Sequence, residues 1–295
     1  MKKHVAIMLS ALMLILVFAG CASKPQAASA PAVPFEVGSD TAEYVVDGSS
    51  GWTSYGVNLK IVSGEDVLFN GVVTLTSDDM FVSEATFAAI TEKGISSDGV
   101  QAGFITSIGD YVAGNDADGN YMFWGYTVNG KTVNFACNQM RALEGDYILW
   151  DYQKYDENAV ATALPSGLTA PFETGSDTAE YTVDGASGWT SYDVYVKIVA
   201  GEDVLFNGTV KMTSDNMFAS EATYAAIVEK GISSDGVQAG FINSIGDYVS
   251  GNDADGNYMY WGYTVNGKMV NFACNQMNLL EGDYLLWEFQ TYSEK

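Results

Sequence analysis

The chain has 295 residues, with 13 basic and 37 acidic side chains and a formal net charge of −24. This acidity excludes nucleic acid as a natural partner, because phosphate binding needs a basic surface. Hydrophobic residues make up 47% and aromatic residues 13% of the chain, which is enough for folded cores and argues against disorder.

Residues 1–20 have the order of features of a signal peptide. Two lysines precede an apolar run over residues 5–19, which is shorter than the roughly 20 residues of a membrane-spanning helix. The run ends in Phe-Ala-Gly-Cys at residues 18–21, which resembles the lipobox of bacterial lipoproteins. An ordinary signal peptide followed by a chance cysteine is the alternative. We expect an exported protein, anchored on the extracytoplasmic side of a membrane by a lipid on Cys21.

Residues 21–33 comprise this cysteine and a segment rich in Ala, Ser and Pro that is typical of a flexible tether. Removal of the signal peptide leaves 11 basic and 37 acidic residues, a net charge of −26, and no histidine. A polybasic membrane patch is absent from this sequence, so attachment must come from the lipid. The acidity is interpreted as a solvation device, with cation binding as the alternative.

Residues 34–155 recur as residues 171–292 at a constant offset of 137 without a gap, and 24 of the 122 positions differ. This is a tandem duplication. Each copy is long enough to bury its own core, and residues 156–170 are typical of a linker. We call residues 34–155 repeat 1 and residues 171–295 repeat 2. Their likeness reports the duplication and does not by itself mark functional residues.

Short alternating segments dominate each repeat and predict strands. In repeat 1 the expected strands cover residues 57–62, 72–76, 102–108, 121–128 and 147–153. Gly64 and the pair Asn70-Gly71 are expected to supply turns between strand pieces. Asn129-Gly130 predicts a hairpin, because this dipeptide suits the positive backbone angles of a type I′ turn.

One helix is expected in each repeat, from about Ser83 to Lys93 in repeat 1. Ser83 can cap its first turn, alanine and larger apolar residues provide one buried face, and Gly94 ends it. One helix among about six short strands predicts an α+β domain, in which a mixed sheet packs on the single helix.

Two segments of each repeat carry a family resemblance. They are Phe-Trp-Gly-Tyr-Thr-Val-Asn-Gly at 123–130 and Glu-Gly-Asp-Tyr-Ile-Leu-Trp at 144–150, with close copies at 260–267 and 281–287. These segments resemble the bacterial transcobalamin-like C-terminal domain family, over most of each repeat from about residue 57. The resemblance implies two tandem β-grasp-like domains and binding of cobalamin or another small ligand.

The resemblance makes aromatic and amide side chains the candidate ligand-binding residues. These are Trp124, Tyr126 and Asn129 in repeat 1 and Trp261, Tyr263 and Asn266 in repeat 2. Trp124 and Tyr126 share one face of their strand, because side chains alternate along a strand. On the outer face they would form a stacking surface for a planar ligand or a sugar. On the inner face they would be core, where small domains usually place large aromatic residues.

Residues 115–120 resemble part of a calcium loop, which makes four carboxylates weaker metal-ligand candidates. They are Asp116 and Asp118 in repeat 1 and Asp253 and Asp255 in repeat 2. The acidic residue and the late glutamate of a helix-loop-helix calcium motif are missing, so a polar turn is the favoured interpretation.

Cys137 and Cys274 occupy equivalent positions, one in each repeat, so neither repeat can close an internal disulfide. A buried free thiol is expected in each repeat, with a bridge between the repeats as the alternative. Catalysis finds no support, because these thiols lack a histidine base and no phosphate-binding loop occurs.

These observations favour a non-enzymatic, surface-anchored lipoprotein that binds a small ligand on an aromatic strand face or between the repeats. Cobalamin or another corrinoid is the candidate ligand, and no cofactor is required. The alternative is an adhesion or scaffold protein, whose repeats bind a surface protein or glycan with avidity. A concave aromatic cleft would favour the first function, and a flat acidic surface would favour the second.

Overall fold

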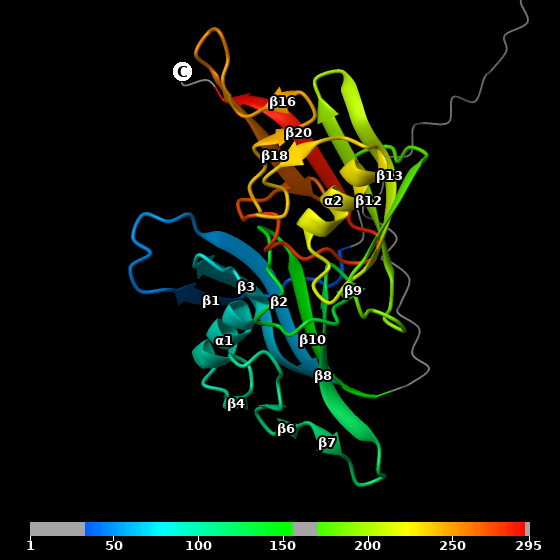
Figure 1. Cartoon of the computed structure of the whole chain (residues 1–295). Helices are drawn as coiled ribbons and strands as arrows, with labels where there is room; N and C mark the ends of the chain where they lie inside the picture. The colour runs from blue at the N-terminus through cyan, green and yellow to red at the C-terminus, as the bar shows by residue number, and fades with distance from the viewer. Residues whose placement is uncertain (1–32, 156–169, 293–295) are drawn as a thin grey trace, which may run out of the picture. The chain divides into compact units, whose positions relative to one another are not determined.

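A computed structural model describes residues 33–155 and 170–292, which cover repeat 1 and all but the last three residues of repeat 2 (Figure 1). The predicted signal peptide, the predicted lipidation site Cys21 and most of the predicted linker lie outside the described residues. Neither helix within the described ranges combines the length and the apolar character needed to cross a membrane.

Repeat 1 is built on one mixed, seven-stranded sheet. Its strands are β1 (Asp40–Val45), β2 (Tyr55–Ser63), β3 (Asp66–Thr76), β7 (Gly114–Asn115), β8 (Tyr121–Val128), β9 (Lys131–Thr132) and β10 (Tyr147–Lys154). Their order is β1-β3-β2-β10-β8-β7, with β9 paired to β8. The β1–β3 and β2–β10 pairs are parallel, and the other pairs are antiparallel.

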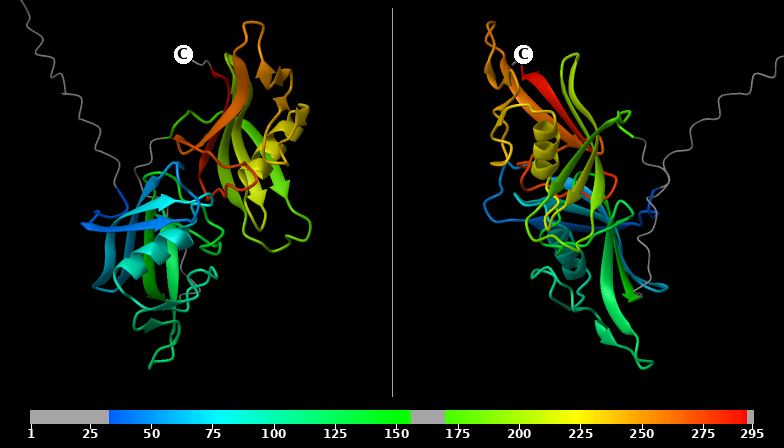
Figure 2. Two further views of the ribbon diagram at one scale, coloured as in Figure 1. Left: turned by 90° about the vertical axis from the view of Figure 1, so that its left-hand side faces the viewer. Right: turned by 45° about the vertical axis from the view of Figure 1, so that its right-hand side comes forward.

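Helix α1 (Val82–Glu92) covers one face of this sheet and contacts β1, β2 and β3 (Figure 2). Alternate residues of the strands face the helix and form the core, as Val57, Leu59 and Ile61 of β2 do. A second, three-stranded sheet consists of β4 (Ser97–Asp98), β5 (Ser107–Ile108) and β6 (Tyr111–Val112).

Repeat 2 has the same architecture. Its elements are β11 (Asp177–Thr182), β12 (Tyr192–Ala200), β13 (Asp203–Thr213), α2 (Ala219–Glu229), β14 (Ser234–Asp235), β15 (Ser244–Ile245), β16 (Tyr248–Val249), β17 (Gly251–Asn252), β18 (Tyr258–Val265), β19 (Lys268–Met269) and β20 (Tyr284–Tyr292). The order β11-β13-β12-β20-β18-β17 matches that of repeat 1. The predicted α+β class, with a mixed sheet on one helix in each of two tandem domains, is confirmed.

The turn predicted at Asn70-Gly71 is wrong. Both residues lie inside β3, and the chain reverses instead between Ser63 and Asp66. Gly71 pairs with Asp40 of β1, where an added Cβ would lie 1.8 Å from the Asp40 carbonyl oxygen. Glycine is therefore required here by the close approach of another strand. The strand predicted over residues 102–108 is also wrong, except for the two residues of β5.

The helix begins one residue earlier than predicted and has a different cap. Phe81 is the N-cap residue, and Ser83 is buried in the first turn. Glu84 Oε2 accepts a hydrogen bond from the Phe81 backbone N–H at 3.0 Å, while its Oε1 accepts one from the Ser77 hydroxyl at 2.8 Å. The carboxylate of Glu84 thus supplies the capping that was predicted for Ser83. Burial raises the pKa of this carboxyl.

We predict that Thr86→Val destabilises repeat 1 by about 1–3 kcal/mol in the free energy of unfolding. Thr86 Oγ1 accepts the indole N–H of Trp150 at 2.8 Å, and the indole is 2% exposed and stacked on Tyr126. Valine keeps the shape but leaves this N–H unpaired in the core. Urea denaturation measures the change. Thr91→Val, on the exposed part of the same helix and matching Val228 of repeat 2, is the control. Equal effects of both changes would contradict the prediction.

Candidate functional site

The predicted aromatic ligand-binding residues lie in the cores of the two domains. Trp124 and Tyr126 are 6% and 8% exposed, and Trp261 and Tyr263 are 7% and 6% exposed. The Trp124 indole N–H donates to the Tyr111 carbonyl oxygen at 3.1 Å. Burial also raises the pKa of the Tyr126 phenol. These four side chains therefore pack inside, as the interpretation of these aromatics as core residues expects, and do not form an open stacking surface.

Asn129 and Asn266 lie elsewhere, at the type I′ turns of the two repeats. Asn129 has a φ of 52°, which confirms the predicted hairpin. Its Nδ2 donates to Asp146 Oδ1 at 2.8 Å, and its Oδ1 accepts the Tyr147 backbone N–H at 3.0 Å. Asn266 makes the same two bonds within repeat 2. Both asparagines line a cavity at which the repeats meet.

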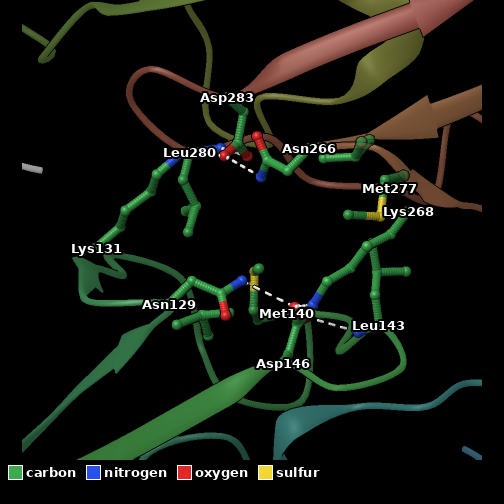
Figure 3. Close-up of a pocket in the computed structure, with 12 residues that line it drawn as sticks. Asn129, Lys131, Met140, Leu143, Asp146, Asn266, Lys268, Met277, Leu280 and Asp283 are labelled. Atoms are coloured by element: carbon green, nitrogen blue, oxygen red, sulfur yellow. Dashed lines mark hydrogen bonds and ion pairs between the residues drawn. The ribbon is translucent and has the colours of Figure 1, made fainter. Parts of the chain in front are cut away.

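Six residues of each repeat, at equivalent positions, line this cavity (Figure 3). They are Val128, Asn129, Lys131, Met140, Leu143 and Asp146, with Val265, Asn266, Lys268, Met277, Leu280 and Asp283. The free space is about 20 Å³, enough for about one water molecule. This cavity therefore cannot hold a corrinoid, and its chemistry serves the contact between the repeats.

Two ion pairs cross this contact. Lys131 Nζ donates to Asp283 Oδ1, and Lys268 Nζ donates to Asp146 Oδ1 at 2.5 Å. The Lys131 and Asp283 side chains are only 3% and 5% exposed, whereas that of Lys268 is 32% exposed. A charge this far from water is costly unless a partner of opposite charge satisfies it.

Each carboxylate accepts hydrogen bonds from its own repeat in addition to its ion pair with the lysine of the other repeat. Asp283 Oδ2 accepts the Leu280 backbone N–H at 2.7 Å, and Oδ1 accepts the Asn266 amide at 2.8 Å. Asp146 accepts the equivalent two hydrogen bonds in repeat 1, from Leu143 and Asn129. The acceptor atoms are thus fixed in place by the turn and the loop that flank them.

Apolar side chains cross the contact in the same reciprocal way. Leu143 belongs to the buried core of repeat 2, and Leu280 belongs to that of repeat 1. Phe135 and Phe272 each pack against both cores. Two further hydrogen bonds, Asn134 Nδ2 to Tyr192 Oη at 2.7 Å and Asn271 Nδ2 to Tyr55 Oη at 2.5 Å, complete the set. Equivalent residues thus exchange roles, as across a two-fold axis.

Arg141 breaks this reciprocity. Its side chain is 6% exposed and lies between the rings of Phe81 in its own repeat and Phe272 in the other, at 4.8 and 4.6 Å. Its Nε donates to the Gln276 carbonyl oxygen of repeat 2 at 3.2 Å, and its Nη2 is paired with Asp79 at 3.1 Å. The guanidinium therefore joins the repeats by a hydrogen bond and a cation–π contact.

Asn278 occupies the equivalent position in repeat 2. Its Nδ2 donates to the Asn216 carbonyl oxygen at 2.7 Å, inside the same repeat. Its Oδ1 is buried, with no hydrogen-bond partner among the residues described. Repeat 2 therefore lacks the arginine bridge that repeat 1 provides.

The aspartate-rich turns close on themselves. Asp116 Oδ1 accepts the backbone N–H groups of Asp118 and Asn120 at 2.9 and 2.8 Å, and Oδ2 accepts the Asn120 amide at 2.9 Å. These bonds, led by that of the amide, lower the pKa of Asp116. Asp253 makes the equivalent bonds with Asp255 and Asn257 in repeat 2. Within the described ranges, no three His, Cys, Asp or Glu side chains are grouped to hold a metal ion. The contacts support the polar-turn interpretation.

Cys137 and Cys274 are free and buried, one in each core. The predicted buried thiols are confirmed, and the alternative of a bridge between the repeats is wrong. Burial raises the pKa of each thiol to about 12, so neither is a ready nucleophile. Lys131 and Asp146 were not among the residues predicted to form a site. The only sequence signal for them is their position. Lys131 follows the Asn129-Gly130 turn and Asp146 lies in the Glu-Gly-Asp segment, and the turn and the segment both belong to the family resemblance.

We predict that Lys131→Met lowers the free energy of unfolding by about 3 kcal/mol, because it leaves the buried Asp283 carboxylate without its cation. Lys268→Met is the matched change. It also removes the cation from a buried carboxylate, because Asp146 is 4% exposed, but it should cost less than Lys131→Met, because Lys268 is 32% exposed and water can take the place of its ammonium group. Guanidinium denaturation of the two variants gives the comparison. A larger loss from Lys268→Met would contradict this account of the site.

Three comparisons place the chain among known proteins. The profile of a domain of unknown function, DUF4430, matches residues 80–154 and 215–291, which together exceed half of the chain. No curated protein matches. A solved structure of a Ruminococcus gnavus protein, to which metal binding is ascribed, is similar over 35% of this chain and 99% of its own, with 16% identity and a TM-score of 0.26. The chain therefore belongs to the DUF4430 family, with one such domain in each repeat.

Proposed function

We propose that this chain is an exported, lipid-anchored and non-catalytic binding protein, which presents two DUF4430 domains to a protein or glycan on a cell surface. One observation carries the proposal. Phe104 and Phe241, at equivalent positions of the two repeats, are 72% and 73% exposed, while the four strand aromatics that were the candidate ligand-binding residues are buried in the cores. Val112 and Val249 of the adjacent small sheets are also exposed.

The backbone of the loop that carries Phe104 is fixed by hydrogen bonds and close contacts, so the side chain extends from a defined position. Gly99 and Gly103 have φ angles of 86° and 96°, and an added Cβ on Gly99 would lie 1.9 Å from the Phe104 carbonyl oxygen. The Thr106 backbone N–H donates to the Asp98 carbonyl oxygen at 3.0 Å, and that of Cys137 donates to the Gly103 carbonyl oxygen at 3.0 Å. Because the backbone that carries the ring is already ordered, little backbone conformational entropy is lost when a partner covers the ring.

Burial of one such ring contributes about 1.5–3 kcal/mol, which is a weak interaction alone. Two equivalent rings on one chain convert the second contact into an intramolecular event and raise the overall affinity without new chemistry. A lipid on Cys21 would hold both domains at the membrane surface. The duplication then serves avidity, which is the function expected of an adhesion or scaffold protein.

We retain the transcobalamin-like resemblance for the β-grasp-like fold only, and we propose no corrinoid ligand for the chain. The indoles and phenols that would stack on a corrinoid are core residues, and the cavity at Asn129 and Asn266 is water-sized. The proposal also assigns no enzymatic activity and no cofactor, in keeping with the raised pKa of the two thiols.

We predict that Phe104→Ser and Phe241→Ser each weaken binding of a labelled chain, Ala22–Lys295, to isolated cell envelopes about tenfold, and that the double variant loses it. Flow cytometry and glycan arrays measure the binding. Val67→Ser with Val204→Ser is the matched control, because these valines are 54% and 56% exposed at another place in each repeat. Equal losses in both double variants would contradict the proposal. Saturable quenching of tryptophan fluorescence by cobinamide would replace it with corrinoid binding.

The membrane anchor is tested separately. We predict that Cys21→Ala, in a chain from which the signal peptide is still removed, releases the protein into the culture medium or the periplasm, because we expect the lipid on Cys21 to attach the mature chain. Detergent phase partitioning and palmitate labelling of the expressed chain measure the anchor. Unchanged membrane association of the variant would contradict lipidation and leave the binding proposal standing.

A further inference from the structure

We propose that the surface joining the two repeats is a homotypic docking surface, whose partner is the same surface on a second copy of this chain. This inference goes beyond the proposed function and does not depend on it. It concerns how DUF4430 repeats recognise one another, and it predicts three kinds of pair: two copies of repeat 1, two copies of repeat 2, and one of each.

The reciprocity of the contact carries the inference. Lys131 reaches Asp283 as Lys268 reaches Asp146, and the leucine and the asparagine–tyrosine contacts are exchanged in the same way. Each repeat therefore carries both halves of every such contact. An interface of this kind is self-complementary, so two identical repeats make the same contacts as two different repeats.

The residues concerned are identical in the two repeats. All twelve cavity-lining residues form six equivalent pairs without a substitution, and the Tyr55–Tyr192 and Asn134–Asn271 pairs are also unchanged. In a pair of two repeat 1 copies, Lys131 would therefore meet Asp146 of the second copy. Leu143 would enter the core of the second copy, as it now enters that of repeat 2.

In the intact chain each repeat supplies the partner of the other repeat's surface. Lys131 makes its ion pair with the other repeat, and no ion pair joins it to its own among the residues described. Leu143 is 6% exposed because the other repeat covers it. A repeat without its sibling would expose this leucine and its lysine, and a second copy restores both contacts. The surface therefore combines buried apolar side chains with buried, paired charges, and a partner must supply both kinds of contact.

Arg141 ranks the three pairs. It reaches Phe272 and Gln276 of repeat 2, and the equivalent Phe135 and Gln139 are present in repeat 1. Two repeat 1 copies would share two such bridges, a mixed pair has one, and two repeat 2 copies have none. The concentration at which a pair dissociates should therefore rise in that order.

The test keeps the chain whole until it has folded. A protease site is inserted between residues 156 and 169, the folded chain is cut, and native mass spectrometry follows the halves, which differ in mass. At micromolar concentration the cut halves should remain together. After dilution and reconcentration all three pairs should appear, with the repeat 1 pair persisting to the lowest concentration. Halves that separate at micromolar concentration, or that return only as mixed pairs, would overturn the proposal.

Lys131→Glu gives a selective version of the same experiment. In a repeat 1 pair the new glutamate faces Asp146 of the other copy at two places, and in a mixed pair it faces Asp283 at one place. The affinity of the repeat 1 pair should therefore fall at least a hundredfold, and that of the mixed pair should fall less. Lys154→Glu is the matched control, because Lys154 is exposed at the end of β10 and makes no ion pair in the described residues. Persistence of the repeat 1 pair in Lys131→Glu would count against the proposal.

Arg141→Asn combined with Asp79→Asn tests the ranking. This double change gives repeat 1 the Asn216 and Asn278 combination that repeat 2 carries naturally, so the fold is expected to tolerate it. The three pairs should then dissociate at similar concentrations. A repeat 1 pair that remains the tightest would show that Arg141 does not set the order, and equal stabilities in the unchanged chain would show the same.

Discussion

A buried lysine makes the two repeats depend on each other, because its counter-ion belongs to the other repeat. The Lys131 side chain is 3% exposed, and an ammonium group in such a place needs a carboxylate that is itself fixed. Asp283 is fixed by the Leu280 backbone N–H and by the amide of Asn266 in the type I′ turn. The type I′ turn and the loop before β20 therefore position the carboxylate on which the contact between the two repeats depends. The same holds around Asp146, where the lysine is more exposed.

The elements that the sequence predicted well depend on local chemistry. Alternation placed β8 at its observed bounds and β10 within one residue, and the Asn129-Gly130 dipeptide specified its turn through backbone angles alone. The other Asn-Gly dipeptide, Asn70-Gly71, does not form the predicted turn. Gly71 is required instead by the close approach of Asp40, which lies 31 positions earlier in the chain. Sequence patterns report local preferences, and they do not tell when a glycine is required by a distant strand.

The candidate site shows the same division between local and distant information. Strand parity correctly placed Trp124 and Tyr126 on one face, but only the position of the helix decides which face is the core. Lys131 was missed because its partner lies 152 residues away in the chain. Nothing near a lysine in a sequence distinguishes a solvated side chain from one that will be buried against another domain.

The substitution of Arg141 by Asn278 separates two roles that one side chain combines in repeat 1. In both repeats this side chain donates to the backbone carbonyl of residue 79 or 216, next to a methionine with a positive φ. That local bond survives the change, and the loss of the ion pair is matched by the change of Asp79 to Asn216. The contacts with Phe81, Phe272 and Gln276 have no counterpart, because asparagine is too short and carries no charge. The arginine bridge therefore distinguishes the two halves of the interface, without disturbing the turn from which it extends.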